Sequence, residues 1–341
     1  MGIQGLLSKC KFEDFDIESY KYKNLGIDMY VLLHRFIGKD FAKELVEQPD
    51  LFVPKYYENI YRFLNSFIKF NYNLYLVYDG DKMNYKIAEY RREEMRNIMR
   101  KVAIETGDWT RCVDIVPAQM YNFHLYLKEH KLVDKFKFIV APFEADAQLG
   151  YLFKKGIINS VLTVDSDLIV YGIDNILFLN TLDHGIRVYK RLEPVENPTC
   201  VNEIPKSKLW LFGYLIKCDY FKGISGIGII RALNIVSKLK LKPVGVSDEI
   251  DWNDAFNSIK NLVINKNKLV EFDFKYFNVV RYVFSKQPVV DPVDNTLRYL
   301  DGTIITANNI DFGCITNYKE VSLGIYDPIT RKPFTDSRIN K

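Results

Sequence analysis

Residues 137–156 read KFIVAPFEADAQLGYLFKKG, and this stretch decides the predicted fold. Its first part, residues 137–140, is a short apolar run that predicts a buried β-strand. Pro142 suits the first turn of a helix, and Gly156 suits the position just after the end of that helix. A strand that leads directly into a helix is the repeating unit of an α/β fold with a parallel sheet.

The same alternation continues on both sides of this stretch. A helix is expected from about residue 30, directly after the first apolar run. We therefore predict an α/β fold with a mainly parallel central sheet flanked by helices. The other predicted strands are residues 25–27, 74–78, 161–164 and 176–179.

The pattern becomes helical after residue 207. Residues 206–218 and 229–239 are expected to form two helices joined by a glycine-rich turn, and residues 251–286 to form further helices. Residues 290–341 show no firm periodicity and are expected to wrap the core as an extension.

The composition excludes several classes of protein. The chain has 341 residues, of which 48% are hydrophobic and 26% charged, as in globular soluble proteins. No apolar run is long enough to cross a bilayer, and the start MGIQGLLSKC does not resemble a secretory signal. Five cysteines without CxxC spacing and only four histidines argue against a zinc site or a disulfide framework. A net charge of +4 permits nucleic-acid binding without requiring it.

Acidic residues recur where the predicted strands end. In open α/β sheets, ligands bind outside the carboxyl ends of the strands, so residues far apart in sequence can converge on one site. Any one of these residues alone is more often an ordinary turn residue, but their repetition at successive strand ends favours a shared site. The set is Asp28, Asp79, Glu144, Asp146, Asp165, Asp167 and, after a predicted helix, Asp219.

Seven carboxylates in one cleft would repel one another unless cations neutralised them. Magnesium is the natural partner, because it prefers hard oxygen ligands. The absence of a histidine or cysteine cluster favours Mg²⁺ or Mn²⁺ over zinc. Two such ions, about 3.5–4 Å apart, can activate a water and stabilise the leaving oxygen of a phosphodiester.

Six motifs, in sequence order, resemble those of the structure-specific 5′ nucleases, the family of flap endonucleases, exonuclease one and the XPG repair nucleases. They span residue 1 to about residue 300. The motifs are MGIQGLL (1–7), LGIDMYVLLHR (25–35), LVYDG (76–80), VAPFEADAQLGYL (140–152), TVDSDLIVYG (163–172) and CDYFKGISGIGIIRAL (218–233).

Within that family the chain is most similar to exonuclease one. It has Glu144-x-Asp146 where flap endonucleases usually show two glutamates, and His34 where they tend to carry a tyrosine. The segment LGIYDPIT (323–330) also resembles the region that closes the exonuclease-one nuclease core.

The resemblance implies a PIN-like 5′ nuclease core with a helical arch and a helix–two-turn–helix. It implies three regions: 1–110, with the arch at about 81–111; 111–240, with the helix–two-turn–helix at about 207–240; and 241–341. All seven carboxylates match the family's ligands for two Mg²⁺ ions, which Mn²⁺ can replace.

Residues 81–111 are rich in charge, and Arg92, Arg96 and Arg100 share one helix face. From the residues alone, a solvated helix with Glu89 and Glu93 ion pairs explains this equally well.

The family carries its arch here, and Lys86 matches the arch lysine that polarises the scissile phosphate. The family's next basic position is Glu93 in this chain. Arg92 or Arg96 is the candidate substitute, and we assign catalysis to Arg92 and DNA binding to Arg96.

The turn at residues 223–228 reads GISGIG and precedes Arg231. Such a turn alone is usually just a tight connection between helices. It resembles the helix–two-turn–helix, which implies that Gly226, Gly228 and Arg231 grip the DNA backbone, with a possible K⁺ ion.

Tyr30 and His34 lie one helical turn apart, directly after Asp28. They are either a core tyrosine with a hydrogen-bonded histidine or a stacking platform for a terminal nucleotide. Gly2 would be the mature N-terminus, which lies near the active site in the family.

We predict a Mg²⁺-dependent 5′→3′ exonuclease and 5′-flap endonuclease acting on DNA ends, nicks, gaps and flaps in repair, replication or recombination. A non-catalytic DNA-junction scaffold and an RNA-acting 5′ exonuclease remain open alternatives. The resemblance implies a nuclear location, and we expect a monomer that does not bind membranes. The sequence contains no sliding-clamp motif and no mismatch-repair tail, so it does not support partnerships with a sliding clamp or with mismatch-repair proteins.

Overall fold

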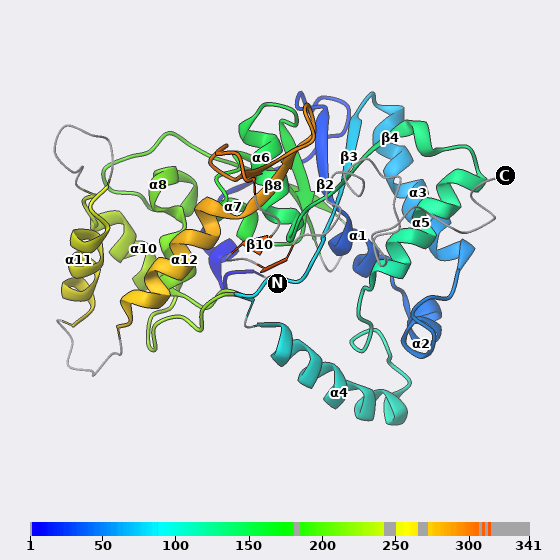
Figure 1. The fold of residues 1–341 in the computed structure, drawn as a ribbon, viewed down its shortest axis with the longest axis horizontal. Coiled ribbons are helices and arrows are strands. Elements are labelled where there is room, and N and C mark those ends of the chain that lie inside the picture. Colours follow the sequence, from blue (N-terminus) through cyan, green and yellow to red (C-terminus); the bar gives the residue numbers. More distant parts are fainter. Residues whose placement is uncertain are drawn as a thin grey trace.

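A computed structural model describes residues 2–86, 88–180, 185–241, 250–264, 272–306, 309–310 and 313–314 (Figure 1). Its centre is a seven-stranded sheet in the order β1-β7-β6-β5-β2-β3-β4. Strands β6, β5, β2, β3 and β4 run parallel, whereas β7 and β1 are antiparallel additions at one edge. The strands are β1 (Phe12–Asp14), β2 (Asn24–Asp28), β3 (Asn73–Tyr78), β4 (Phe136–Val140), β5 (Ser160–Thr163), β6 (Asn175–Leu179) and β7 (Ile186–Lys190).

Helices cover both faces of the sheet (Figure 1). Successive side chains of a strand point to opposite faces, so each strand contributes to two separate cores. In β3, Leu74 and Leu76 join the core under α1, α3 and α5, whereas Tyr75 and Val77 join the core under α6 and α7. These helices are α1 (Met29–Arg35), α3 (Pro54–Lys69), α5 (Pro117–Glu129), α6 (Ala145–Lys154) and α7 (Asp167–Val170), and α2 (Lys39–Glu47) follows α1.

A glycine lets α6 lie close to the middle of the sheet. A Cβ atom on Gly26 of β2 would approach side-chain carbons of Leu149 and Ile158 to 2.6 Å. The missing side chain therefore lets the middle of α6 pack directly on β2.

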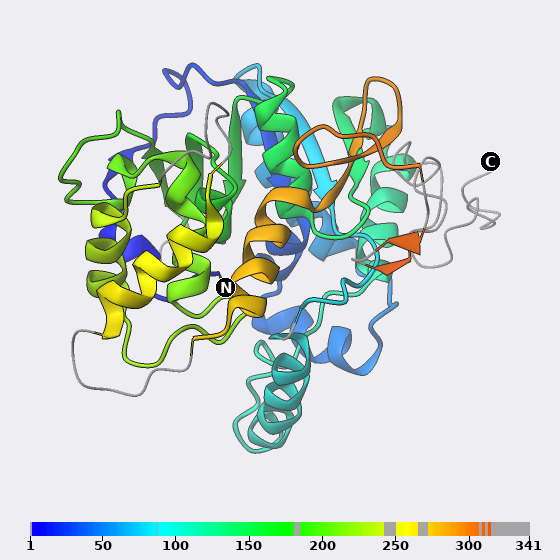
Figure 2. The same ribbon diagram turned by 60° about the vertical axis from the view of Figure 1, so that its left-hand side comes forward.

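The second half of the chain adds a helical part beside the sheet (Figure 2). A hairpin, β8 (Pro288–Asp291) with β9 (Thr296–Tyr299), then returns to α6, where Gln148 Nε2 donates to the Val290 carbonyl at 2.7 Å. The helical elements are α8 (Lys206–Leu209), α9 (Leu211–Leu215), α10 (Ile229–Lys238), α11 (Trp252–Ile264) and α12 (Phe274–Lys286). Short pieces complete the fold: η1 (Leu6–Lys9), η2 (Val133–Lys135), η3 (Val201–Glu203), β10 (Asn309–Ile310) and β11 (Gly313–Cys314).

Helix α4 (Ala88–Thr106) stands away from the body of the molecule in both views (Figures 1 and 2). The described residues on either side of it, 79–86 after β3 and 107–116 before α5, form turns and irregular chain. This helix occupies the region where the sequence predicts an arch. No helix in the described part of the chain is both long and apolar enough to span a bilayer.

The predicted fold class is confirmed, and the predicted strands correspond to β2 to β6. The predicted helix end is also confirmed, since Gly156 follows the last residues of α6 with a left-handed φ of 72°. The segment LGIYDPIT and most of residues 290–341 lie outside the described residues, and the three-region division stays a prediction.

Two local predictions were wrong. Pro142 does not open a helix, because the Pro142 and Phe143 carbonyls accept hydrogen bonds from Asp81 N and Gly80 N at 2.9 and 2.6 Å. Helix α6 therefore begins only at Ala145.

Residues 206–218 do not form one helix but two short ones, α8 and α9. The chain turns extended at Ile216 because Gly223 packs on the Ile216–Lys217 backbone, where a Cβ atom would come within 2.6 Å. The prediction also missed β1, β7 and the β8–β9 hairpin, which are short or at an edge.

Candidate active site

The seven predicted acidic residues come from elements that meet at the carboxyl-terminal end of the parallel strands. Strands β5, β2, β3 and β4 are consecutive neighbours and parallel, so their carboxyl ends lie side by side. Asp28 ends β2, Asp79 follows β3, Glu144 and Asp146 open α6 after β4, and Asp165 and Asp167 follow β5. Asp219 arrives from the loop between α9 and α10.

Backbone hydrogen bonds fix the first two carboxylates. Asp28 is the N-cap of α1, and its side chain accepts from Val31 N at 3.2 Å. Asp79 Oδ1 accepts from Ala145 N, the first residue of α6, at 2.7 Å. The end of β3 is thereby tied to the start of the acidic helix.

Gly80 makes this connection possible, although it was not among the predicted site residues. A Cβ atom here would lie 1.9 Å from the Ala141 carbonyl oxygen, so no larger residue fits without a backbone shift. The signal available in the sequence was a glycine directly after a strand-end aspartate, which indicates close backbone approach.

Asp165 and Asp167 are 8% and 4% exposed. The Asp167 amide donates to Asp165 Oδ1 at 3.0 Å, and the Asp165 amide donates to Thr163 Oγ1 at 3.0 Å. Gly2 packs against this turn, since a Cβ atom on it would lie 2.2 Å from Asp165 Oδ1. The N-terminal segment therefore lies at the carboxylates, where the family resemblance puts it.

Burial and mutual repulsion disturb the protonation of these groups. Burial, and then the nearby Asp79 carboxylate, raises the pKa of Asp28 well above its ordinary value. Burial and the Asp165 carboxylate do the same to the pKa values of Asp146 and Asp167. The pKa of Asp79 is raised to about 6, mainly by burial and Glu144, against the lowering effect of Lys86. A site with this much uncompensated negative charge calls for cations.

Two cations from the arch region reach the carboxylates. Lys86 Nζ pairs with Glu144 Oε2 at 2.5 Å, and Arg92 Nη2 pairs with Asp219 Oδ2 at 2.5 Å. Burial alone would lower the pKa of Lys86, but Glu144 and Asp79 outweigh it and raise that pKa. Arg96 instead pairs with Asp114 Oδ2 at 2.9 Å. Arg92, one residue before Glu93, is therefore the arch arginine that reaches the site.

The donor set fits a hard divalent cation. All seven side chains offer oxygen, and the buried Oδ1 of Asp167 has no hydrogen-bond partner in the described structure. Among the described residues, no three acidic, histidine or cysteine side chains already form a metal-binding group. Lys86 and Arg92 already pair with one oxygen each of two of these carboxylates, Glu144 and Asp219.

Two family models match this sequence. The XPG N-terminal domain matches residues 1–99, and the XPG I-region matches residues 135–219, so together they cover more than half of the chain. The chain belongs to the XPG family. The predicted family is thereby confirmed.

Named relatives agree with this assignment. Exodeoxyribonuclease 1 of Schizosaccharomyces pombe is 29% identical over 88% of this chain and 52% of its own length. DNA damage-inducible protein DIN7 of Saccharomyces cerevisiae is 26% identical over 94% of this chain and 72% of its own length. The chain thus spans about half the length of the first of these relatives.

Solved structures of the XPG type share the fold. The catalytic core of Rad2 in complex with DNA substrate matches with a TM-score of 0.54 and 16% identity, over 96% of this chain and 97% of that one. Human GEN1 in complex with Holliday junction DNA matches with a TM-score of 0.52 and 13% identity, over 97% of this chain and 75% of that one. At these identities the likeness shows the fold, and it confirms the predicted 5′ nuclease core.

The predicted stacking residues of this XPG chain, Tyr30 and His34, lie on α1 directly after Asp28. Burial lowers the pKa of His34, with Asp114 opposing and Arg96 reinforcing that shift. His34 therefore shares its surroundings with the Arg96–Asp114 ion pair, which joins α4 to the segment before α5. The DNA contacts of Tyr30, His34 and Arg96 stay predictions.

The glycine-rich turn opens α10. Gly226 has a left-handed φ of 78°, and Gly228 is the N-cap of α10 without a side-chain hydrogen bond, so backbone amides are accessible there. Arg231 Nη2 donates to the Val263 carbonyl at 3.0 Å. The Arg231 side chain thus contacts α11 rather than extending free from the turn.

Proposed function

We propose that this chain is a structure-specific nuclease that hydrolyses DNA phosphodiesters near 5′ ends. The carrying observation is the meeting of seven carboxylates and two arch cations at one sheet edge. The names of its relatives, which include exodeoxyribonuclease 1, support this proposal, as does the Rad2 core in complex with DNA substrate. The expected actions are 5′→3′ exonuclease cleavage of duplex ends and endonuclease cleavage of 5′ flaps.

The seven carboxylates would hold two Mg²⁺ ions, directly or through water, and Mn²⁺ could replace them. When bound, these ions would supply Lewis-acid stabilisation of negative charge on a phosphodiester. A fixed set of oxygen donors on rigid strand ends supports accurate positioning of such ions.

Lys86 and Arg92 would act on the substrate itself. Each is now paired with one carboxylate, and a phosphodiester entering the site offers an alternative anionic partner. Their positive charges would then lie beside the scissile phosphate, where negative charge grows in the transition state. Tyr30 and His34 would stack on the terminal nucleotide, and the turn at 223–228, with a K⁺ ion, would hold the duplex backbone.

The decisive test uses a 5′-labelled flap substrate and a recessed-end duplex, each with Mg²⁺ or with EDTA. The wild type should give Mg²⁺-dependent products, and their lengths distinguish flap cleavage from stepwise digestion. Asp165→Ala should give none. The matched control is Asp134→Ala in η2, an exposed aspartate just before β4 and at the opposite end of that strand from the carboxylates, which should cleave normally.

Binding of flaps without cleavage under any metal condition would overturn the nuclease proposal in favour of a junction-binding scaffold. Preferential cleavage of a matched RNA substrate would point to an RNA-acting 5′ exonuclease instead. We also propose that the protein works as a monomer in the nucleus. Sedimentation and a tagged chain in cells would test these two points separately.

A further inference from the structure

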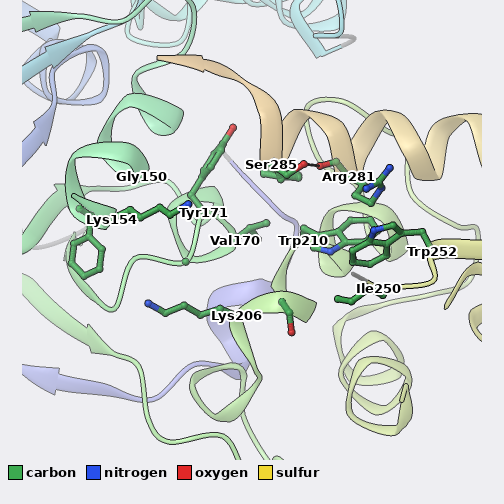
Figure 3. A pocket seen from close by; sticks show the side chains of 14 residues that line it. Gly150, Lys154, Val170, Tyr171, Lys206, Trp210, Ile250, Trp252, Arg281 and Ser285 are labelled. Atoms are coloured by element: carbon green, nitrogen blue, oxygen red, sulfur yellow. Dashed lines mark hydrogen bonds between the residues drawn. The ribbon is translucent and has the colours of Figure 1, made fainter. Parts of the chain in front are cut away.

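A cavity of about 620 Å³ opens between the α6–α7 side of the sheet and the helical part (Figure 3). It is formed by the ends of α6 and α7, the start of α8, α12 and the residues leading into α11. None of the seven carboxylates lines it. Its size falls within the range of about 300–1,000 Å³ that is usual for small-molecule sites.

The charged residues that line this cavity are all cations: Lys154, Lys206 and Arg281. Lys206 is neutralised, because its Nζ pairs with Asp174 Oδ2 at 2.7 Å. Lys154 and Arg281 form no carboxylate ion pair within the described ranges. Two cations therefore face one cavity, and none of the described residues that line it is acidic.

Arg281 is the more unusual of the two. Its guanidinium lies 5.1 Å from the ring centre of Trp252, and its buried Nε has no hydrogen-bond partner among the described residues. Burial also lowers the pKa of Arg281. An arginine that is desolvated without a carboxylate costs free energy, which a bound anion would offset.

Flat aromatic surfaces stand beside these cations. Trp210 and Trp252 pack edge to face at 5.4 Å, and the Tyr171 and Phe284 rings, which also line the cavity, lie 5.1 Å apart. Figure 3 shows Lys154 reaching in from one side, with Arg281 lying over Trp252 on the other. A ligand that matches both the cations and the aromatic rings needs an anionic group and a flat ring.

We propose that this cavity is a second nucleotide-binding site, in which a base packs against Trp252 and a phosphate meets Lys154 and Arg281. A free mononucleotide and a nucleotide within a DNA strand share this chemistry. The site is separate from the carboxylates, so it does not depend on the proposed nuclease function.

The test uses intrinsic tryptophan fluorescence of the full chain in EDTA, which removes divalent cations from the carboxylates. Two of the three tryptophans line the cavity, so a stacked base should quench them. The probes are deoxyadenosine monophosphate, deoxyadenosine without phosphate, and a short phosphorothioate oligonucleotide. Calorimetry with the same probes gives an independent dissociation constant.

We expect saturable binding of the monophosphate and weaker binding of the nucleoside. Lys154→Glu and Arg281→Gln should each weaken monophosphate binding about tenfold or more, the order expected for one charge-assisted contact. Lys275→Glu is the charge-matched control for Lys154→Glu. It changes an exposed lysine of α12 that does not line the cavity, and it should bind normally.

Competition by the oligonucleotide would identify a DNA strand as the occupant, and its failure to compete would identify free nucleotides. Binding that is unchanged in Lys154→Glu would overturn the proposal. So would the lack of any saturable signal from both the monophosphate and the oligonucleotide at millimolar concentration. Lys154 is exposed at the end of α6, so this variant should fold, and circular dichroism verifies it.

Discussion

Two buried aspartates in this molecule have opposite surroundings. Asp291 at the end of β8 is 6% exposed and accepts from the Tyr151 hydroxyl at 2.7 Å and from Val293 N at 3.0 Å, with Arg298 Nε at 3.4 Å. Asp167 at the start of α7 is 4% exposed, yet one of its oxygens lacks a hydrogen-bond partner among the described residues. Burial and the Asp165 and Asp219 carboxylates raise its pKa, against the Ile3 backbone amide and the N-terminal ammonium.

Equal burial of the same residue type therefore has two meanings. The charge of Asp291 is compensated, so this residue fastens the β8–β9 hairpin to α6 and contributes to stability. The charge of Asp167 is repelled by the neighbouring Asp165 and Asp219 carboxylates, so this residue costs stability. Its presence there is therefore explained by something other than stability. Uncompensated charge of this kind is typical of functional sites.

The largest expected effect is that of Asp167→Asn, which keeps the side-chain shape and removes the charge. Cleavage of the flap substrate should fall about a thousandfold, as for loss of a group that acts on the transition state. In EDTA at neutral pH the variant should unfold at a higher temperature than the wild type, because repulsion with Asp165 is removed. Loss of activity together with lower stability would mean that Asp167 is structural like Asp291.

Asp291→Ala should behave in the opposite way. Removing one partner of a buried ionic network costs about 3 kcal/mol of unfolding free energy. Urea titration measures this loss, and cleavage per folded molecule should stay near the wild-type value. Asp294→Ala is the matched control, because Asp294 is more exposed and shares only Arg298 with the network. A large loss of activity in folded Asp291→Ala would remove the contrast between the two sites.

Two of the arch arginines, Arg92 and Arg96, extend the comparison to cations. Arg92→Met should lower the single-turnover rate about a hundredfold, because Arg92 lies against the carboxylates. Arg96→Met should leave that rate nearly unchanged at saturating substrate and weaken substrate binding instead, since Arg96 pairs with Asp114 outside the site. The reverse pattern in quench-flow kinetics would reassign the catalytic role to Arg96.

The sequence predicted the parallel core and the acidic set because both rest on local signals. Apolar runs such as 74–78 are followed within a few residues by an acidic residue, and strand order then brings Asp28 and Asp79 together. The ion pairs of Lys86 with Glu144 and of Arg92 with Asp219 could not be predicted in the same way. It depends on how the segment before α4 turns back on the sheet, which no local pattern specifies.

The misses have physical causes as well. Pro142 is a residue type that favours the first turn of a helix. Here, however, the Pro142 and Phe143 carbonyls accept hydrogen bonds from the Asp81 and Gly80 amides, so the helix begins later. The helix expected through residue 218 ends at Leu215, because the turn at Gly223 needs an extended backbone beneath it. The cavity behind α7 also escaped prediction, since its walls come from five separated elements.

The smallest expected effect concerns pH, and it tests the cost of the acidic site directly. The folded-state pKa of Asp79, about 6, lies above the ordinary value of 3.8, so the folded protein binds the proton more tightly than the unfolded chain. Stability from this group is therefore highest at low pH and is lost as pH rises through about 6.

In EDTA, Asp79→Asn should be more stable than the wild type by about 2 kcal/mol at neutral pH, with a smaller gap near about pH 5. Added Mg²⁺ should reverse the gap at neutral pH, because it binds only the ionised, folded site. A gap that urea titration finds constant across this range, with or without Mg²⁺, would show that the Asp79 charge costs the fold nothing.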